Sequence, residues 1–141
     1  MSGSTNMLTE NDIVKAVSLF LKNGGYVIDQ ALKTSQQGID IEATAPNGVK
    51  CFVEAKGATS SKKETSRYGK EFNSNQVKTH VGAALLKSFQ TLQLHNSSEV
   101  VIALPNNKLH KLIIKSMYEP IKASGIRVFF VSQDGAVDVF I

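Results

Sequence analysis

The sequence of 141 residues has a single cysteine and no apolar run as long as a membrane span. One cysteine excludes a disulfide within the chain and a zinc site built from thiolates, and we expect Cys51 to be a buried free thiol. The start of the chain lacks the charged and apolar regions of a secretory signal. We therefore expect a cytoplasmic protein with no membrane partner.

Internal repeats and low-complexity tracts are also absent, and the composition is that of a globular protein, with 42% hydrophobic and 20% charged residues. The length suits one domain, which we place at residues 8–141, and the small polar residues 1–7 are expected to be disordered. The net charge of +4 permits binding to a polyanion without requiring it.

The strongest signal in the chain is a pair of short strands around a tight turn, between Gly38 and Gly57. Because side chains alternate along a strand, one face of this hairpin is apolar. Its predicted members are Ile39, Ile41, Ala43, Cys51, Val53 and Ala55. The predicted members of the opposite face are Asp40, Glu42, Glu54 and Lys56.

The length of the turn decides whether the charged residues meet, since a shift of one residue moves a strand's side chains to the other face. A two-residue loop would pair Asp40 with Ala55. A three-residue loop, Pro46-Asn47-Gly48, forms a type I turn in which the glycine is left-handed. That loop sets Asp40 opposite Glu54 and pairs apolar residues with apolar residues, so we predict the three-residue loop.

Two facing carboxylates repel each other unless a cation neutralises them. Oxygen ligands on a rigid hairpin suit a hard divalent ion, so Asp40 and Glu54 predict a site for Mg²⁺ or Mn²⁺. Lys56 lies two residues beyond Glu54 on the same face, where it can hold or help deprotonate a water. The alternative is an ordinary solvated face of an edge hairpin.

Before the hairpin, apolar residues at helical spacing predict a helix from Leu8 to the Gly24-Gly25 pair, with Thr9 as its N-cap. Glu10 lies in the first turn, where its charge complements the helix dipole. Its other candidate role is to point toward the Asp40 and Glu54 carboxylates. A strand is predicted at 26–32.

After the hairpin, the segment 58–72 carries four basic residues against two acidic ones and is rich in hydroxyl groups. Such side chains contact phosphates, and the segment begins directly after Lys56. The alternative is a solvated surface loop. The candidate nucleic-acid contacts, including two on the following helix, are Thr59, Ser60, Lys62, Lys63, Arg67, Lys70, Gln76 and Lys78.

The clearest helix is predicted at 73–94. Its expected core stripe is Val77, Val81, Ala84, Leu85, Phe89 and Leu92, and a neighbouring stripe is Gln76, His80, Ala83 and Lys87. We interpret His80 as an ordinary half-buried histidine.

The rest of the chain predicts a buried strand at 100–104, a helix that begins at Pro105-Asn106, and strands at 126–131 and 137–141. Leu109, Leu112, Ile113 and Met117 are expected to form the inner face of that helix. Pro120 is expected to stop or kink it.

An aspartate, then thirteen residues, then Glu-Ala-Lys, on a hairpin after a helix, resembles the PD-(D/E)xK, or restriction-endonuclease-like, nuclease superfamily. The small size is most similar to its Mrr-like and Holliday-junction-resolvase-like members. The resemblance implies an α/β domain with an αβββαβ core, a mixed sheet flanked by helices, and a further helix and strands at the C-terminal end.

By this resemblance, Asp40, Glu54 and the backbone carbonyl of Ala55 would bind the metal, Lys56 would position or activate the water, and Glu10 would be an additional acid. Gln76 resembles the glutamine that RecB-like members place at the start of the following helix, although their tyrosine one turn later is His80 here. Ile39 stands where the family has a proline.

The expected function is metal-dependent hydrolysis of phosphodiester bonds in nucleic acid, with DNA as the expected substrate. A symmetric homodimer is expected by analogy if both strands of a duplex are cut. One alternative is a nucleic-acid-binding or assembly module of the same fold without turnover. Another is an interaction domain whose acidic residues have no metal role.

Overall fold

The computed structural model describes residues 7–32, 38–59 and 72–141, and every structural statement below concerns these residues. Along the described chain the elements are α1 (Glu10–Asn23), β1 (Val27–Ala31), β2 (Ile41–Thr44), β3 (Lys50–Ala55), α2 (Ser74–Leu94), β4 (Glu99–Pro105), α3 (Lys108–Lys115), α4 (Tyr118–Ser124), β5 (Arg127–Val131) and β6 (Val137–Val139). The first six elements form the predicted αβββαβ core.

The strands form one mixed sheet in the order β1-β2-β3-β4-β5-β6. The β1–β2 and β2–β3 pairs are antiparallel, the β3–β4 and β4–β5 pairs are parallel, and β6 is antiparallel to β5. The parallel pairs follow from the helical crossovers, since parallel strands need a long connection. The predicted fold class, a single α/β domain with an αβββαβ core and a mixed sheet flanked by helices, is confirmed.

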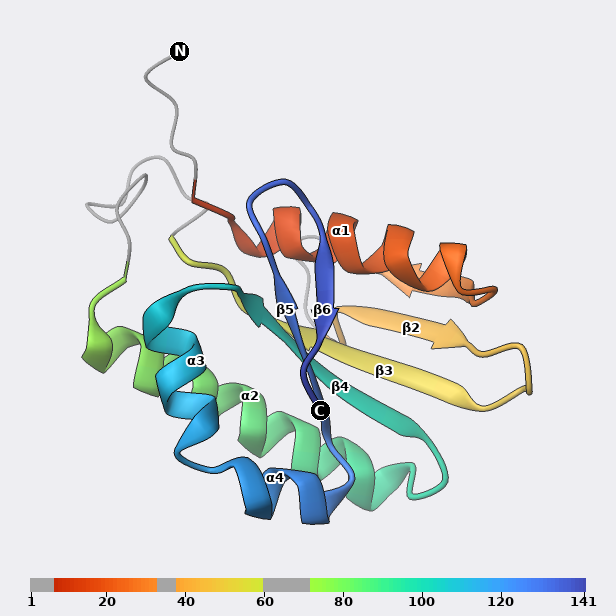
Figure 1. The fold of residues 1–141 in the computed structure, drawn as a ribbon. Coiled ribbons are helices and arrows are strands. Elements are labelled where there is room, and N and C mark those ends of the chain that lie inside the picture. Colours follow the sequence, from red (N-terminus) through yellow and green to blue (C-terminus); the bar gives the residue numbers. More distant parts are fainter. Residues whose placement is uncertain (1–6, 33–37, 60–71) are drawn as a thin grey trace.

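Helices cover both faces of the sheet, with α1 on one face and α2, α3 and α4 on the other (Figure 1). The core under α1 contains Ile13 and Val17 of the helix together with Val101 and Ala103 of β4. The core under α2 contains the alternate residues of that strand, among them Ile102. The central strands are therefore buried on both faces, as their apolar sequences predict.

Two predictions about helices were wrong in detail. In α2 the buried stripe runs through Val77, Val81, Ala84, Ser88 and Thr91, whereas Phe89 is 50% exposed. The apolar stripe is thus continued by two small polar residues, and the Thr91 hydroxyl donates to the carbonyl of Lys87 within the helix. Phe89 lies one position off that stripe.

We expected one helix that Pro120 would stop or kink. The structure has two helices instead, α3 and α4, which are separated at Ser116 and Met117. Pro120 lies in the first turn of α4, where a backbone N–H has no partner within the helix, so it neither stops nor kinks that helix. On α3, Leu112 is exposed while His110 and Ile114 are buried. The inner face is therefore rotated from the predicted one.

Cys51 is buried, as expected, and burial raises the pKa of its thiol to about 12. Among the described residues, none of the helices is both long and apolar enough to cross a membrane. The expected disorder of residues 1–6 falls outside the described part of the chain. Met7 is described and is half-buried.

Candidate functional site

The turn between β2 and β3 has the predicted three-residue loop. The Ala45 N–H donates to the Val49 carbonyl at 2.8 Å, and the Gly48 N–H donates to the Ala45 carbonyl at 2.8 Å. Gly48 has φ +86°, the left-handed conformation that closes a type I turn with a bulge. Pro46, Asn47 and Gly48 are thus the loop.

This turn produces the predicted register, in which Ile41 lies opposite Val53 and Ala43 lies opposite Cys51. All four side chains are buried in the core under α1. Ile39 does not share this face, contrary to the prediction. It lines a small cavity with Phe52, Ser88 and Thr91, on the α2 side, because β2 begins only at Ile41 and the alternation does not extend back to Ile39.

Asp40 immediately precedes β2 and is tied to the end of β3. Its Oδ2 accepts a hydrogen bond from the Ala55 N–H at 2.7 Å, and its backbone carbonyl accepts one from the Leu32 N–H at 2.7 Å. A side-chain oxygen thus bonds a backbone donor of the neighbouring strand. These bonds fix the carboxylate beside Glu54.

The two carboxylates are brought together and buried, with exposed fractions of 7% for Asp40 and 8% for Glu54. Burial raises the pKa of Asp40, and burial followed by the charge of Asp40 raises the pKa of Glu54. Both shifts mean that two negative charges in this position are costly without a nearby cation.

Two lysines approach Glu54 from different elements. The Lys56 Nζ lies 3.8 Å from Glu54 Oε2, and the Lys87 Nζ of α2 lies 3.3 Å from Glu54 Oε1. Lys87 also donates a hydrogen bond to the Gly38 carbonyl. Glu54 Oε1 is buried and accepts no hydrogen bond in the described structure, so its contact with Lys87 is an ion pair without hydrogen-bond geometry.

Sequence reasoning placed Lys87 on a helical stripe with Gln76 and His80 but gave it no role at the site. The signal was present, because Lys87 follows His80 by two turns on the same side of α2. What the sequence could not supply is the packing of α2 across β3, which points this stripe at Glu54.

Glu10 reaches the site because the start of α1 docks on the residues after β3. The Ala58 N–H donates to the Leu8 carbonyl at 2.8 Å. A side chain at Gly57 would place its Cβ 2.5 Å from the Glu10 nitrogen, so only glycine permits this approach. Burial, and next the charge of Asp40, raise the pKa of Glu10.

Three of the residues predicted to contact nucleic acid lie in the described part of the chain. Thr59 is buried, Lys78 is exposed on α2, and the Gln76 side-chain carbonyl accepts from the Asn73 N–H at 2.9 Å in a capping box. The other five, Ser60, Lys62, Lys63, Arg67 and Lys70, lie outside the described residues. His80 packs edge-on against Phe72, and burial, then the charge of Lys56, lower its pKa.

The donor set can be compared with the needs of a divalent cation. In the described part of the chain, no group of three or more His, Cys, Asp or Glu residues is placed to hold a metal ion, so Glu10 does not form a cluster with Asp40 and Glu54. The two carboxylates fit a hard cation that keeps several waters, since Mg²⁺ commonly uses only one or two protein carboxylates. The buried Glu54 oxygen without a hydrogen bond agrees with that fit.

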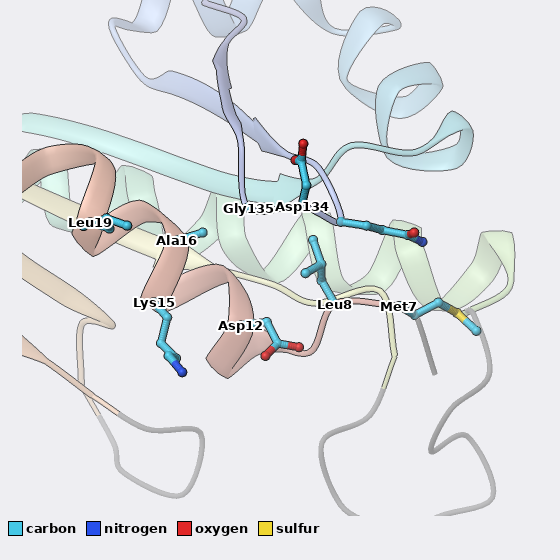
Figure 2. A pocket seen from close by; sticks show the side chains of 9 residues that line it. Met7, Leu8, Asp12, Lys15, Ala16, Leu19, Asp134 and Gly135 are labelled. Atoms are coloured by element: carbon cyan, nitrogen blue, oxygen red, sulfur yellow. The ribbon is translucent and has the colours of Figure 1, made fainter. Parts of the chain in front are cut away.

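A larger cavity, of about 510 Å³, lies elsewhere, between the start of α1 and the turn from β5 to β6 (Figure 2). Its lining includes Leu8, Lys15 and Asp134. None of Asp40, Glu54 and Lys56 lines it. The carboxylate pair is therefore a site at the end of a strand and not the floor of this cavity.

Chains similar to this one are found among solved structures. An XisH family protein from Nostoc punctiforme is 18% identical, with a TM-score of 0.55 over 90% of this chain and 96% of that one. An fdxN element excision controlling factor protein from Anabaena variabilis is also 18% identical, with a TM-score of 0.55 over 91% and 96%. This likeness shows the fold. No protein-family model and no curated protein matches the chain.

Proposed function

We propose that this protein is a metal-dependent nuclease that hydrolyses phosphodiester bonds, with DNA as its substrate. The observation that carries the proposal is the pair of buried, interacting carboxylates of Asp40 and Glu54 at the end of β3, with Lys56 beside them. The resemblance of their spacing to the PD-(D/E)xK motif supports the same chemistry. The Mrr-like or Holliday-junction-resolvase-like subgroup is part of the proposal.

Each residue has a distinct task in the proposed reaction. Asp40 and Glu54, with the Ala55 carbonyl, hold Mg²⁺ or Mn²⁺, and Glu10 adds negative charge nearby. The cation, when bound, supplies Lewis-acid polarisation of the phosphate and lowers the pKa of a bound water. Lys56 orients the attacking water, whose oxygen bonds to phosphorus as the bond to the leaving oxygen breaks.

The phosphate backbone would be held by lysines, arginine and hydroxyl groups. Lys78 is exposed on α2 and is available for such a contact. The proposed contacts at Thr59, Ser60, Lys62, Lys63, Arg67, Lys70 and Gln76 complete the set. A homodimer would supply two sites if both strands of a duplex are cut.

The direct test is cleavage of linear duplex, single-stranded and branched DNA by the purified protein with Mn²⁺ or Mg²⁺. We expect cleavage by the wild type and a loss on the order of 100-fold or more for Asp40→Asn, because the variant removes a metal ligand. Glu42→Gln is the matched control. Glu42 lies on the same hairpin but accepts a hydrogen bond from Gln30 instead of joining the pair.

Two results would contradict the proposal. Equal cleavage by Asp40→Asn and the wild type would place the activity outside these carboxylates. Salt-dependent binding to DNA without any cleavage would instead indicate the second candidate, a binding or assembly module of the same fold.

Two observations favour this second candidate. Lys87 forms an ion pair with Glu54, so a side chain of the protein already provides part of the positive charge that a metal would bring. One structural neighbour is also named as an excision controlling factor and not as a nuclease. A module of this kind would bind nucleic acid through the same face and use Asp40 and Glu54 for structure.

A further inference from the structure

The Lys87 ammonium group contacts the carboxylate of Glu54, although Lys87 comes from the middle of α2. It lies 3.3 Å from Glu54 Oε1 and donates a hydrogen bond to the Gly38 carbonyl. It therefore joins the end of β3 to the segment that leads into Asp40. Lys56 lies farther from Glu54, at 3.8 Å from the other carboxylate oxygen.

The contact has the character of a counterion to the carboxylate pair. The charges of Lys87 and Lys56 both act to lower the pKa of Asp40 and of Glu54, against the burial that raises it. Two buried like charges need a cation for both to stay ionised. Lys87 supplies such a charge on the side of Oε1.

The lysine is also able to leave. Its side chain is 37% exposed, whereas that of Glu54 is 10% exposed. Lysine has a flexible four-carbon stem and a strongly hydrated ammonium group, so it can turn toward solvent at low cost. Glu54 Oε1 accepts no hydrogen bond from residues 7–32, 38–59 and 72–141, so the departure of Lys87 breaks no hydrogen bond there.

We propose that Lys87 is an internal counterion that competes with a divalent cation for Glu54, and that it sets the affinity of the site for the metal. This inference rests on the proposed function, because it takes Asp40 and Glu54 as the metal-binding pair. A cation at the pair repels the ammonium group and displaces it from Oε1. Lys87 then also releases the Gly38 carbonyl, which couples metal binding to the segment before Asp40.

The experiment is a calorimetric titration with Mn²⁺ of the wild type, Lys87→Met and Lys115→Met. Methionine keeps most of the length of lysine and removes the charge. Lys115 is an exposed lysine of α3 and controls for the change in net charge. We expect Lys87→Met to bind Mn²⁺ roughly three- to tenfold more tightly than the wild type. Lys115→Met should bind like the wild type.

A second readout needs no metal. Without Mn²⁺, Lys87→Met should unfold at a lower temperature than Lys115→Met, because the carboxylate pair has lost its counterion. Added Mn²⁺ should raise the unfolding temperature more in Lys87→Met than in the wild type.

The outcomes separate the two proposals. If Mn²⁺ binds the wild type but binds Lys87→Met with equal or lower affinity, the competition is wrong and the metal site stands. If Mn²⁺ binds none of the three proteins, the metal-dependent function is wrong and this inference fails with it. If Mn²⁺ binds Lys87→Met more tightly than the wild type, and Lys115→Met like the wild type, the result supports both the metal site and the competition.

Discussion

Buried polar side chains differ in how their burial is compensated. Asp40 accepts a hydrogen bond from the Ala55 N–H, and Glu54 has two lysines within 4 Å. His110 is fully buried and has a hydrogen bond on one ring nitrogen only, since Nδ1 lies 2.8 Å from Asn107 Oδ1. That amide oxygen is an acceptor, so Nδ1 carries the proton, and Nε2 has no hydrogen-bond partner in the part of the chain that the structure describes.

This environment predicts a pH-dependent stability. Burial, followed by the charge of His80, lowers the pKa of His110 to about 4. Since the unfolded histidine titrates near its ordinary pKa of 6.5, the contribution of the neutral form is fully present above pH 6.5 and is lost as pH falls from 6.5 toward 4. The free energy of unfolding should fall by at most about 3 kcal/mol from this residue.

The measurement is urea unfolding at pH 7.5 and pH 4.5 of the wild type and of His110→Leu. The variant should lose less stability between the two pH values, because it has no histidine to protonate at position 110. His95→Gln, at an exposed histidine, should keep the wild-type difference. Equal differences for the wild type and His110→Leu would contradict the prediction.

The sequence predicted that Asp40 and Glu54 lie together, but it did not predict which side chains surround them. Alternation and turn chemistry placed Asp40 and Glu54 together because both are local effects within one hairpin. Lys87 depends on how α2 crosses the sheet, and Ile39 depends on where β2 begins. Neither of these is encoded in a short stretch of sequence.

The contact between α1 and the end of β3 shows how elements far apart in sequence are held at the site. Thr9 begins α1 with a capping box, in which it exchanges hydrogen bonds with Asp12. The backbone of Thr9 and Glu10 packs closely against Gly57. The first turn of α1 therefore brings Glu10 near Asp40.

Substitutions at two glycines, Gly57 at this contact and Gly82 away from it, should change the free energy of unfolding in opposite directions. A Cβ at Gly57 would lie 2.7 Å from the Thr9 carbonyl carbon and even closer to the Glu10 nitrogen, both backbone atoms that cannot rotate away. We expect Gly57→Ala to lower the free energy of unfolding by about 2–3 kcal/mol. Gly82, in the exposed face of α2, has no atom within 4 Å of such a Cβ. Gly82→Ala should therefore raise stability by up to about 1 kcal/mol.

Denaturant unfolding of both variants under the same conditions provides the measurement. A Gly57→Ala variant as stable as the wild type would show that the start of α1 can move away from β3 without loss. In that case Glu10 would not be held at the site by this contact.

Elements were predictable where periodicity and end signals agree. The capping residue Thr9 and the Gly24-Gly25 pair indicated the two ends of α1. Gly48 indicated the turn of the hairpin. The break between α3 and α4 was missed because Pro120 was interpreted as an end signal. Proline is equally suited to the first turn of a helix. The sequence alone does not show that a new helix begins after Met117, with Pro120 in its first turn.

Across the whole molecule, the sheet separates two cores that share the same strands. On β4, Val101 lies in the core under α1 and Ile102 lies in the core under α2. A change in either core is therefore transmitted through a strand that belongs to both. We expect the domain to unfold in one cooperative transition.

Cys51 offers a probe of this cooperativity, since it lies in the core under α1. Ile102→Ala should cost about 2–5 kcal/mol in the opposite core. In a urea titration, the reaction of Cys51 with a thiol reagent and the loss of far-ultraviolet circular dichroism should both shift to the same lower midpoint. Leu112→Ala, at an exposed site, should shift neither by much. Reaction of Cys51 well before the loss of helix would indicate that the α1 layer opens independently.

The three-residue turn between β2 and β3 also restricts how this chain can change in length. A single deletion or insertion between Asp40 and Glu54 inverts one strand and separates the carboxylates, while every amino acid of the site is retained. A change of two residues preserves the facing of the side chains. The loop Pro46–Gly48 can therefore change in length by an even number of residues and keep both carboxylates on one face. A change by an odd number would separate them and disable the site, as the loss of a carboxylate would.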